Sequence, residues 1–351
     1  MKRLFLLFIV FLYTINCGGE KDDGTIEDNI PQNSSSTRIT RFEFFYEFPN
    51  LEAYYVDSDD YYVYVGGGSD NQANVSIISL KDFPPIIVSQ FNFNLSLTDK
   101  ITGISYSNKY LFVSTTDTIY ALDVSDPLNP KEVGRKTCSL NQSIKAIFGD
   151  YSIVYAITPD QIVTVSFMGD PPNPNILNTS STSPFVNFAL DLAGVLFIAN
   201  GNDGITVYNV SNIIPSYIDK ITTQYPVYKV NVGLFPEPSF CMAVANGEDG
   251  FSVYNIDDIK NPRLLFHVTP GGKVSDIIFT DNTSHQVVPY IFVANDTNGV
   301  LLIDLKGNIL DKYDTNGKAM QLTFGYVNEN LFVYVADYYS LVILRVLEYY
   351  Q

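Results

Sequence analysis

The chain has 351 residues, of which 46% are hydrophobic and 17% are charged, so it holds enough apolar material for a large core. It carries 21 basic and 38 acidic residues, which gives a net charge of -17. A chain this acidic is repelled by phosphate groups, which argues against nucleic acid and anionic lipid headgroups as partners.

The N-terminus has the pattern of an export signal. Two basic residues precede an apolar run from Leu4 to Ile15, which is too short to span a bilayer comfortably. The run ends in Thr14-Ile15-Asn16-Cys17, which resembles the lipobox of bacterial lipoproteins. The resemblance implies cleavage after residue 16 and lipidation of Cys17. The alternative is an ordinary secretory signal in which Cys17 is incidental.

Residues 17–37 are polar and acidic and show no hydrophobic periodicity. Such a composition cannot bury a core, so we expect a flexible tether between the lipidated Cys17 and the folded part of the chain. We expect residues 38–351 to form a single domain.

One strand–turn–strand pattern recurs seven times along this domain. Residues 198–210 (IANGNDGITVYNV) and 244–256 (VANGEDGFSVYNI) are near copies. The second strand of each unit is marked by an apolar residue, and these residues follow one another at intervals of 48, 44, 41, 46, 49 and 42: Val65, Val113, Ile157, Ile198, Val244, Val293 and Val335. A period of 40–50 residues is typical of repeat architectures.

Each unit predicts four antiparallel strands. A short apolar segment is followed by a strongly apolar strand, a turn rich in Gly, Asp and Asn, and a third apolar strand. A corner containing Pro and a more polar outer strand complete the unit, as in residues 124–137. Seven such units predict an all-β fold, a seven-bladed β-propeller of four-stranded antiparallel blades.

The two ends of the domain predict how the ring closes. The seventh unit ends near Gln351 without room for a fourth strand, whereas Thr37–Phe48 forms a spare strand before the first unit. We expect this N-terminal strand to be the outer strand of blade 7.

The third strands resemble the LVIVD-repeat family of bacterial extracytoplasmic propellers. The matching pieces include residues 300–304 (VLLID), 119–123 (IYALD) and 205–209 (ITVYN), and Asp-Pro or Asn-Pro corners follow several of them. The resemblance covers nearly all of residues 38–351. It implies a propeller at the cell surface and brings no enzyme activity with it.

Residues capable of chemistry are sparse. The only histidines are His267 and His285, and besides Cys17 the only cysteines are Cys138 and Cys241. The repeat places these two cysteines in blades 2 and 5, so we expect free thiols. Oxygen-rich turns such as residues 57–60 and 202–203 invite a calcium site, but local turn chemistry explains them better. We therefore predict no catalytic set, no metal and no cofactor.

One polar row lies on the predicted inner strands, which line the central channel. Aligning the seven units gives Ala53, Gly103, Ala146, Asn187, Lys229, Asp276 and Gln321 at one position. We hypothesise that Asn187, Lys229, Asp276 and Gln321 form a polar wall on one side of the channel. The alternative is that Lys229 and Asp276 pair and hold only channel water.

Together these patterns predict a non-catalytic, lipid-anchored propeller of the cell envelope. We expect it to be a monomer attached to the outer membrane. Its loops would bind a protein or glycan partner that the sequence does not identify. The alternatives are a structural subunit of an envelope complex, or a hydrolase or dehydrogenase of propeller type. The sequence leaves open which face binds and on which side of the membrane the domain lies.

Overall fold

The computed structural model describes residues 38–350 except 69–71, 82, 96–98, 139, 141, 170–171, 182–187, 193, 235–239 and 281–288. The predicted signal peptide (residues 1–16), Cys17, the expected tether (residues 17–37), Asn187 and His285 lie outside the described residues. Residues 40–347 form one compact unit. No helix of the described part is long and apolar enough to cross a membrane.

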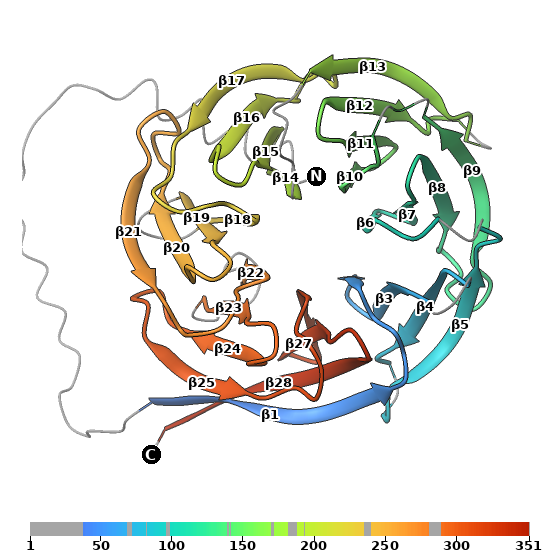
Figure 1. The fold of residues 1–351 in the computed structure, drawn as a ribbon. Coiled ribbons are helices and arrows are strands. Elements are labelled where there is room, and N and C mark those ends of the chain that lie inside the picture. The colour runs from blue at the N-terminus through green and yellow to red at the C-terminus, as the bar shows by residue number, and fades with distance from the viewer. Residues whose placement is uncertain are drawn as a thin grey trace, which may run out of the picture. The chain divides into compact units, whose positions relative to one another are not determined.

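The predicted fold is confirmed: seven four-stranded antiparallel sheets form a β-propeller, seen down its axis in Figure 1. Blade 1 consists, from the inner to the outer strand, of β2 (Tyr55–Ser58), β3 (Tyr62–Gly67), β4 (Asn74–Ser79) and β5 (Ile86–Asn92). Blade 2 consists of β6 (Gly103–Ser107), β7 (Tyr110–Ser114), β8 (Thr118–Asp123) and β9 (Lys131–Thr137). Blade 3 consists of β10 (Ala146–Asp150), β11 (Ile153–Ile157), β12 (Gln161–Ser166) and β13 (Asn175–Ser181).

The same order continues around the ring. Blade 4 consists of β14 (Phe188–Leu192), β15 (Val195–Ala199), β16 (Ile205–Asn209) and β17 (Ser216–Ile221). Blade 5 consists of β18 (Lys229–Leu234), β19 (Phe240–Ala245), β20 (Phe251–Asn255) and β21 (Arg263–Val268). Blade 6 consists of β22 (Asp276–Phe279), β23 (Ile291–Ala294), β24 (Val300–Ile303) and β25 (Ile309–Tyr313). Blade 7 consists of β26 (Gln321–Val327), β27 (Asn330–Ala336), β28 (Ser340–Tyr350) and the N-terminal β1 (Arg38–Pro49).

Ring closure by the N-terminal strand is also confirmed. The strand β1 pairs with β28 as the outer strand of blade 7, and the Arg345 guanidinium donates to Oε2 of Glu43 across this pair, with Nε at 2.8 Å. At the start of blade 1, Ala53 and Tyr338 exchange two backbone hydrogen bonds of 3.2 and 3.0 Å. Gly201 and Val227 exchange the same pair of bonds between blades 4 and 5, so the blade 7–blade 1 junction is built like an internal one.

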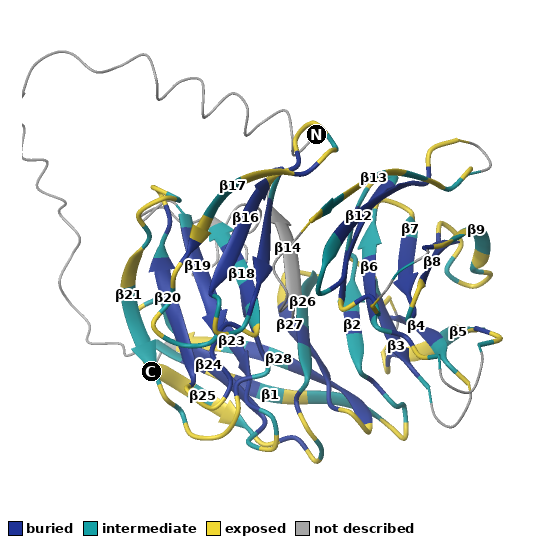
Figure 2. Cartoon of the chain, turned by 45° about the horizontal axis from the view of Figure 1, so that its top comes forward, coloured by how far each residue is buried: buried dark blue, intermediate teal, exposed yellow. Residues whose placement is uncertain are grey.

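The core lies between the blades, because each blade packs its two faces against two neighbours. Seven clusters of buried apolar side chains occur in the described residues, one at each junction between adjacent blades. Figure 2 shows the middle strands as mostly buried and the outer strands as partly exposed. This explains why the second and third strands of every unit are apolar on both faces, which leaves the loops and outer strands as the surface available for function.

Candidate functional site

The predicted polar row is placed correctly in five of the seven blades. Gly103, Ala146, Lys229, Asp276 and Gln321 each begin an inner strand and face equivalent residues of the second strand. In blades 1 and 4 the equivalent residues are Tyr55 and Phe188, which pair with Gly66 and Ala199.

The assignment of Ala53 was wrong by two residues. Its backbone is bonded to Tyr338 in the ring-closing junction instead of to the second strand of its own blade. Small apolar residues such as Ala53 carry no signal that separates these two roles. The residue that marks the second strand of blade 3, Ile157, was also misplaced, by one residue. Ala156 pairs with Ile147 in blade 3 as Val113 pairs with Ile104 in blade 2, so Ala156 is the equivalent residue.

Asp276 of this row connects three blades. Its Oδ2 atom lies 3.1 Å from Nζ of Lys229 in blade 5 and accepts a 2.9 Å hydrogen bond from the Leu322 amide in blade 7. Its Oδ1 atom accepts a 2.9 Å bond from the amide of Ile277 in its own blade. Lys229 and Asp276 therefore pair, as the alternative to a polar wall expected, whereas a channel wall formed by Asn187, Lys229, Asp276 and Gln321 stays a prediction.

Other inner strands use the same device. A carboxylate, amide or hydroxyl oxygen of an inner-strand side chain accepts a backbone N–H of the next blade. These pairs are Asp57 with the Tyr106 amide at 2.7 Å, Ser105 with the Gly149 amide at 3.0 Å, Ser107 with the Tyr151 amide at 2.8 Å, and Asn231 with the Phe279 amide at 2.9 Å. An inner strand has no strand on its axial side, so these side chains satisfy edge groups that would otherwise lack a protein partner.

The oxygen-rich turn at residues 57–60 is held by local bonds. The Oδ1 atom of Asp59 accepts the amides of Tyr61 and Tyr62 at 2.8 and 2.7 Å, and its Oδ2 atom accepts the Tyr64 hydroxyl at 2.8 Å. This confirms the turn interpretation for Asp59. Burial raises the pKa of the neighbouring Asp57 carboxyl to about 6, although hydrogen bonds from the Tyr106 and Ser58 amides partly offset the rise.

In the described residues the two cysteine thiols are buried, and His267 is half-buried on the outer strand β21. Cys138 and Cys241 are free and buried, as predicted, and burial raises the pKa of each thiol to about 11. Both therefore remain protonated at neutral pH and are poor nucleophiles. Nδ1 of His267 lies 2.9 Å from the hydroxyl oxygen of Ser252. The His267 ring stacks on the Tyr225 ring, with the ring centroids 4.1 Å apart.

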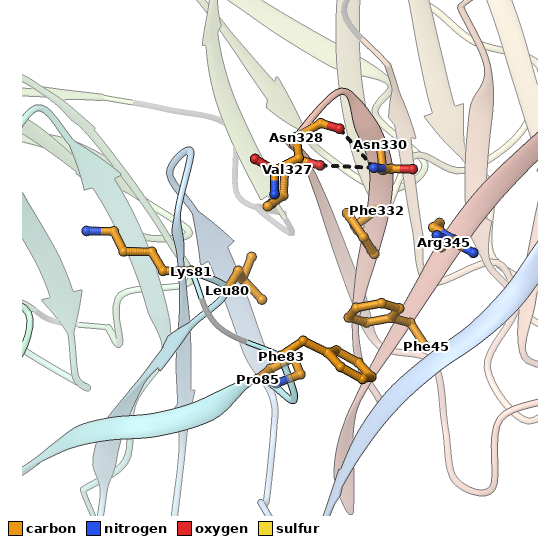
Figure 3. A pocket seen from close by; sticks show the side chains of 10 residues that line it. All are labelled: Phe45, Leu80, Lys81, Phe83, Pro85, Val327, Asn328, Asn330, Phe332 and Arg345. Atoms are coloured by element: carbon orange, nitrogen blue, oxygen red, sulfur yellow. Dashed lines mark hydrogen bonds between the residues drawn. The ribbon is translucent and has the colours of Figure 1, made fainter.

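A pocket of about 270 Å³ lies at the rim, where blade 7 meets blade 1 (Figure 3). We call it the rim pocket. It is lined by Phe45 of β1, Phe332 of β27, Arg345 of β28, the β26–β27 hairpin residues Val327, Asn328 and Asn330, and Leu80, Lys81, Phe83 and Pro85 from the corner between β4 and β5. Sequence reasoning missed this pocket, because its walls come from both ends of the chain.

The walls of the rim pocket are aromatic and apolar. The Phe45 ring lies 5.0 Å from Phe83 and 4.8 Å from Phe332 between centroids. Phe45, Leu80 and Val327 also pack on the buried cluster between blades 7 and 1, so the pocket is the open end of that core. Phe83 is nevertheless 72% exposed.

Several polar groups around the rim pocket are bonded within the chain. Arg345 bonds Glu43, and Nδ2 of Asn330 donates to the carbonyl of Asn328 at 2.9 Å. The Lys81 ammonium lies over the rings of Tyr61 and Tyr62, at 5.2 and 4.8 Å from their centroids. The arrangement is therefore suited to take up an apolar or aromatic group.

No protein-family model and no curated protein matches the sequence. Among solved structures, the chain is similar to the crystal structure of Raptor from Chaetomium thermophilum. The match has a TM-score of 0.66 and 14% identity, and it covers 88% of this chain but only 29% of that one. At this identity the likeness shows the propeller fold alone. Membership of the LVIVD-repeat family stays a prediction.

Because Asp276 connects three blades, we expect its replacement to destabilise the fold strongly. Asp276→Ala leaves the Lys229 ammonium without its buried carboxylate and two amides without their acceptor, so we expect the free energy of unfolding to fall by about 3–5 kcal/mol. Asp203→Ala is the matched control, because it removes an exposed pair with Lys220 and should cost less than about 1 kcal/mol. Denaturant unfolding measures both, and equal losses would contradict the role given to Asp276.

The raised pKa of Asp57 predicts a pH dependence. Its folded value of about 6 exceeds the ordinary value of 3.8, so the folded state binds the proton more tightly and loses this stabilisation as pH rises from about 4 to 6. Asp57→Asn keeps an oxygen acceptor and removes the titration. The unfolding free energy of the wild type minus that of the variant should fall by at most about 1.4 kcal/mol per pH unit in this window. Parallel profiles from urea melts would refute the assignment.

Proposed function

We propose that this protein is a non-catalytic, lipid-anchored propeller of the cell envelope that binds a partner protein at the rim pocket. The observation that carries the proposal is the highly exposed ring of Phe83 beside Phe45 and Phe332. A solvent-exposed aromatic at the mouth of an apolar pocket is the usual anchor of a protein interface.

A protein partner fits this pocket better than a glycan. Sugar hydroxyls need free donors and acceptors around them, whereas Nε and Nη2 of Arg345 and Nδ2 of Asn330 already donate to groups within the chain. The aromatic walls instead match an apolar side chain. The protonated thiols of Cys138 and Cys241 support a binding role over a catalytic one.

Attachment to the membrane rests on the sequence around Cys17. We infer that lipid on this residue holds the protein at the outer membrane through the tether, so that the propeller can act at the cell surface or on the periplasmic face. A single acyl chain gives only marginal membrane binding, and the several chains of a lipoprotein anchor give a stable one.

The anchor is tested by Cys17→Ser. This change removes the acceptor thiol, so the chain should move from the membrane fraction to the soluble fraction after lysis and carbonate washing. Cys138→Ser alters a buried thiol in the propeller and should leave the chain in the membrane fraction. Retention of the Cys17→Ser chain in washed membranes would count against lipidation.

The binding role is tested by placing a photoreactive p-benzoylphenylalanine at Phe83 in intact cells. We expect ultraviolet light to yield one dominant adduct with a second protein. The matched position is Ile214, which is 54% exposed at the equivalent corner of blade 4, between β16 and β17, and should give no such adduct. Adding Phe332→Ala, which enlarges the pocket, should reduce the adduct at position 83. Equal adducts at both corners, or none at Phe83, would reject the rim pocket as the binding site.

A further inference from the structure

Blade 1 ends in an outer strand that lacks the usual protection of a sheet edge. The strand β5 is the edge of its sheet, and in the described residues it pairs only with β4. Charged side chains commonly guard such edges against unwanted pairing. The outer strands β1, β9, β17, β21 and β25 all carry charged residues, whereas β5 (IIVSQFN) carries none.

The edge of β5 is also apolar where it begins. Ile86 and Ile87 are 49% and 40% exposed, although β-branched apolar side chains on an outer strand gain more from burial. The strand β13 of blade 3 is likewise uncharged, but its sequence NILNTSS is mostly polar, with Leu177 as its exposed large apolar residue. Within the described outer strands, β5 therefore combines the two features that favour pairing with another strand.

The backbone of β5 offers donors on its outer side. Phe93, which follows β5 directly, donates its amide to the carbonyl of Ala73, which directly precedes β4. Because amides in an antiparallel ladder alternate with a period of two residues, those of Ser89 and Phe91 face β4 and those of Gln90 and Asn92 face away from it. An incoming strand would find these outward groups ready to bond.

The free edge and the rim pocket adjoin each other. Pro85 lines the pocket, and Ile86 is the first residue of β5. Figure 3 shows β5 starting beside Pro85 and Phe83, with Phe45 of β1 close by. A strand laid along β5 and continued past its first residue therefore reaches the aromatic walls of the pocket.

We propose that the free edge of β5 takes up an extended, uncharged segment of the partner protein as a fifth strand of blade 1, with an aromatic side chain of that segment in the rim pocket. This inference rests on the proposed function and specifies how the partner is held. Backbone hydrogen bonds to β5 provide affinity, and the pocket selects the side chain.

The chemistry of the occupant follows from the surface it covers. An edge without charge over seven residues offers no counter-ion, so a charged segment would lose its hydration without compensation. A second copy of this chain would satisfy the edge, but two chains that each carry a net charge of -17 repel one another. The occupant is therefore a strand from a different protein.

The test compares Gln90→Pro with Gln90→Ala in the full-length, membrane-anchored chain. Both lose the 2.9 Å bond from the Gln90 side chain to Ser76, but only Pro also removes the outward N–H. Proline is tolerated on an edge strand at an outward amide, so both chains should fold and melt together. With p-benzoylphenylalanine at Ile87, the adduct with the partner should be about five- to tenfold weaker in Gln90→Pro.

A second pair of variants keeps the test decisive if Gln90→Pro unfolds. Ile87→Lys places a charge on the edge and should abolish the adduct formed from position 83, whereas Leu177→Lys on β13 should leave it unchanged. Mass spectrometry of the adduct at position 87 should identify an uncharged segment with an aromatic residue from another protein. An adduct with a second copy of this chain would overturn the proposal.

The remaining outcomes separate this inference from the proposed function. Adducts at position 83 that persist unchanged in Gln90→Pro and Ile87→Lys would mean that a protein binds at the pocket without strand addition, which overturns only the inference. Absence of adducts at both 83 and 87 would overturn the binding function as well.

Discussion

The fold depends on one constraint: both faces of every blade are apolar and must be buried against a neighbour. Each of the seven buried clusters draws its side chains from two adjacent blades, so no blade can bury its second and third strands alone. An open array would leave two such faces in water. The ring must therefore close, and the junction between blades 7 and 1 buries an apolar cluster like each of the other junctions.

Closure leaves the inner strands with an unpaired axial edge, and the chain satisfies it with side chains. Asp276, Asp57, Ser105 and Asn231 each accept an amide of the next blade. These polar groups near the channel are thus used to join blades. A polar residue at an inner position is therefore weak evidence for a ligand in this architecture, since blade-to-blade bonding already requires such residues.

Closure also creates the surface on which the proposed function depends. Phe45 comes from the N-terminal strand, Phe332 from the last blade and Phe83 from the first corner. They meet because β1 pairs with β28 beside blade 1. The same junction places the uncharged edge of β5 next to the pocket, so the proposed strand addition and the proposed aromatic anchor would be parts of one site.

The sequence by itself determined the number of blades, the four strands of each and the closing role of the N-terminal strand, because these follow from a repeated hydrophobic pattern with Gly-rich turns. It also predicted free thiols at Cys138 and Cys241, and it offered the pairing of Lys229 with Asp276 as the alternative to a polar channel wall. Only the tertiary structure decided that Ala53 belongs to the junction with Tyr338, and that Phe45, Phe83 and Phe332 share a pocket. Contacts between residues hundreds of positions apart depend on the closed ring, and no local pattern along the chain records them.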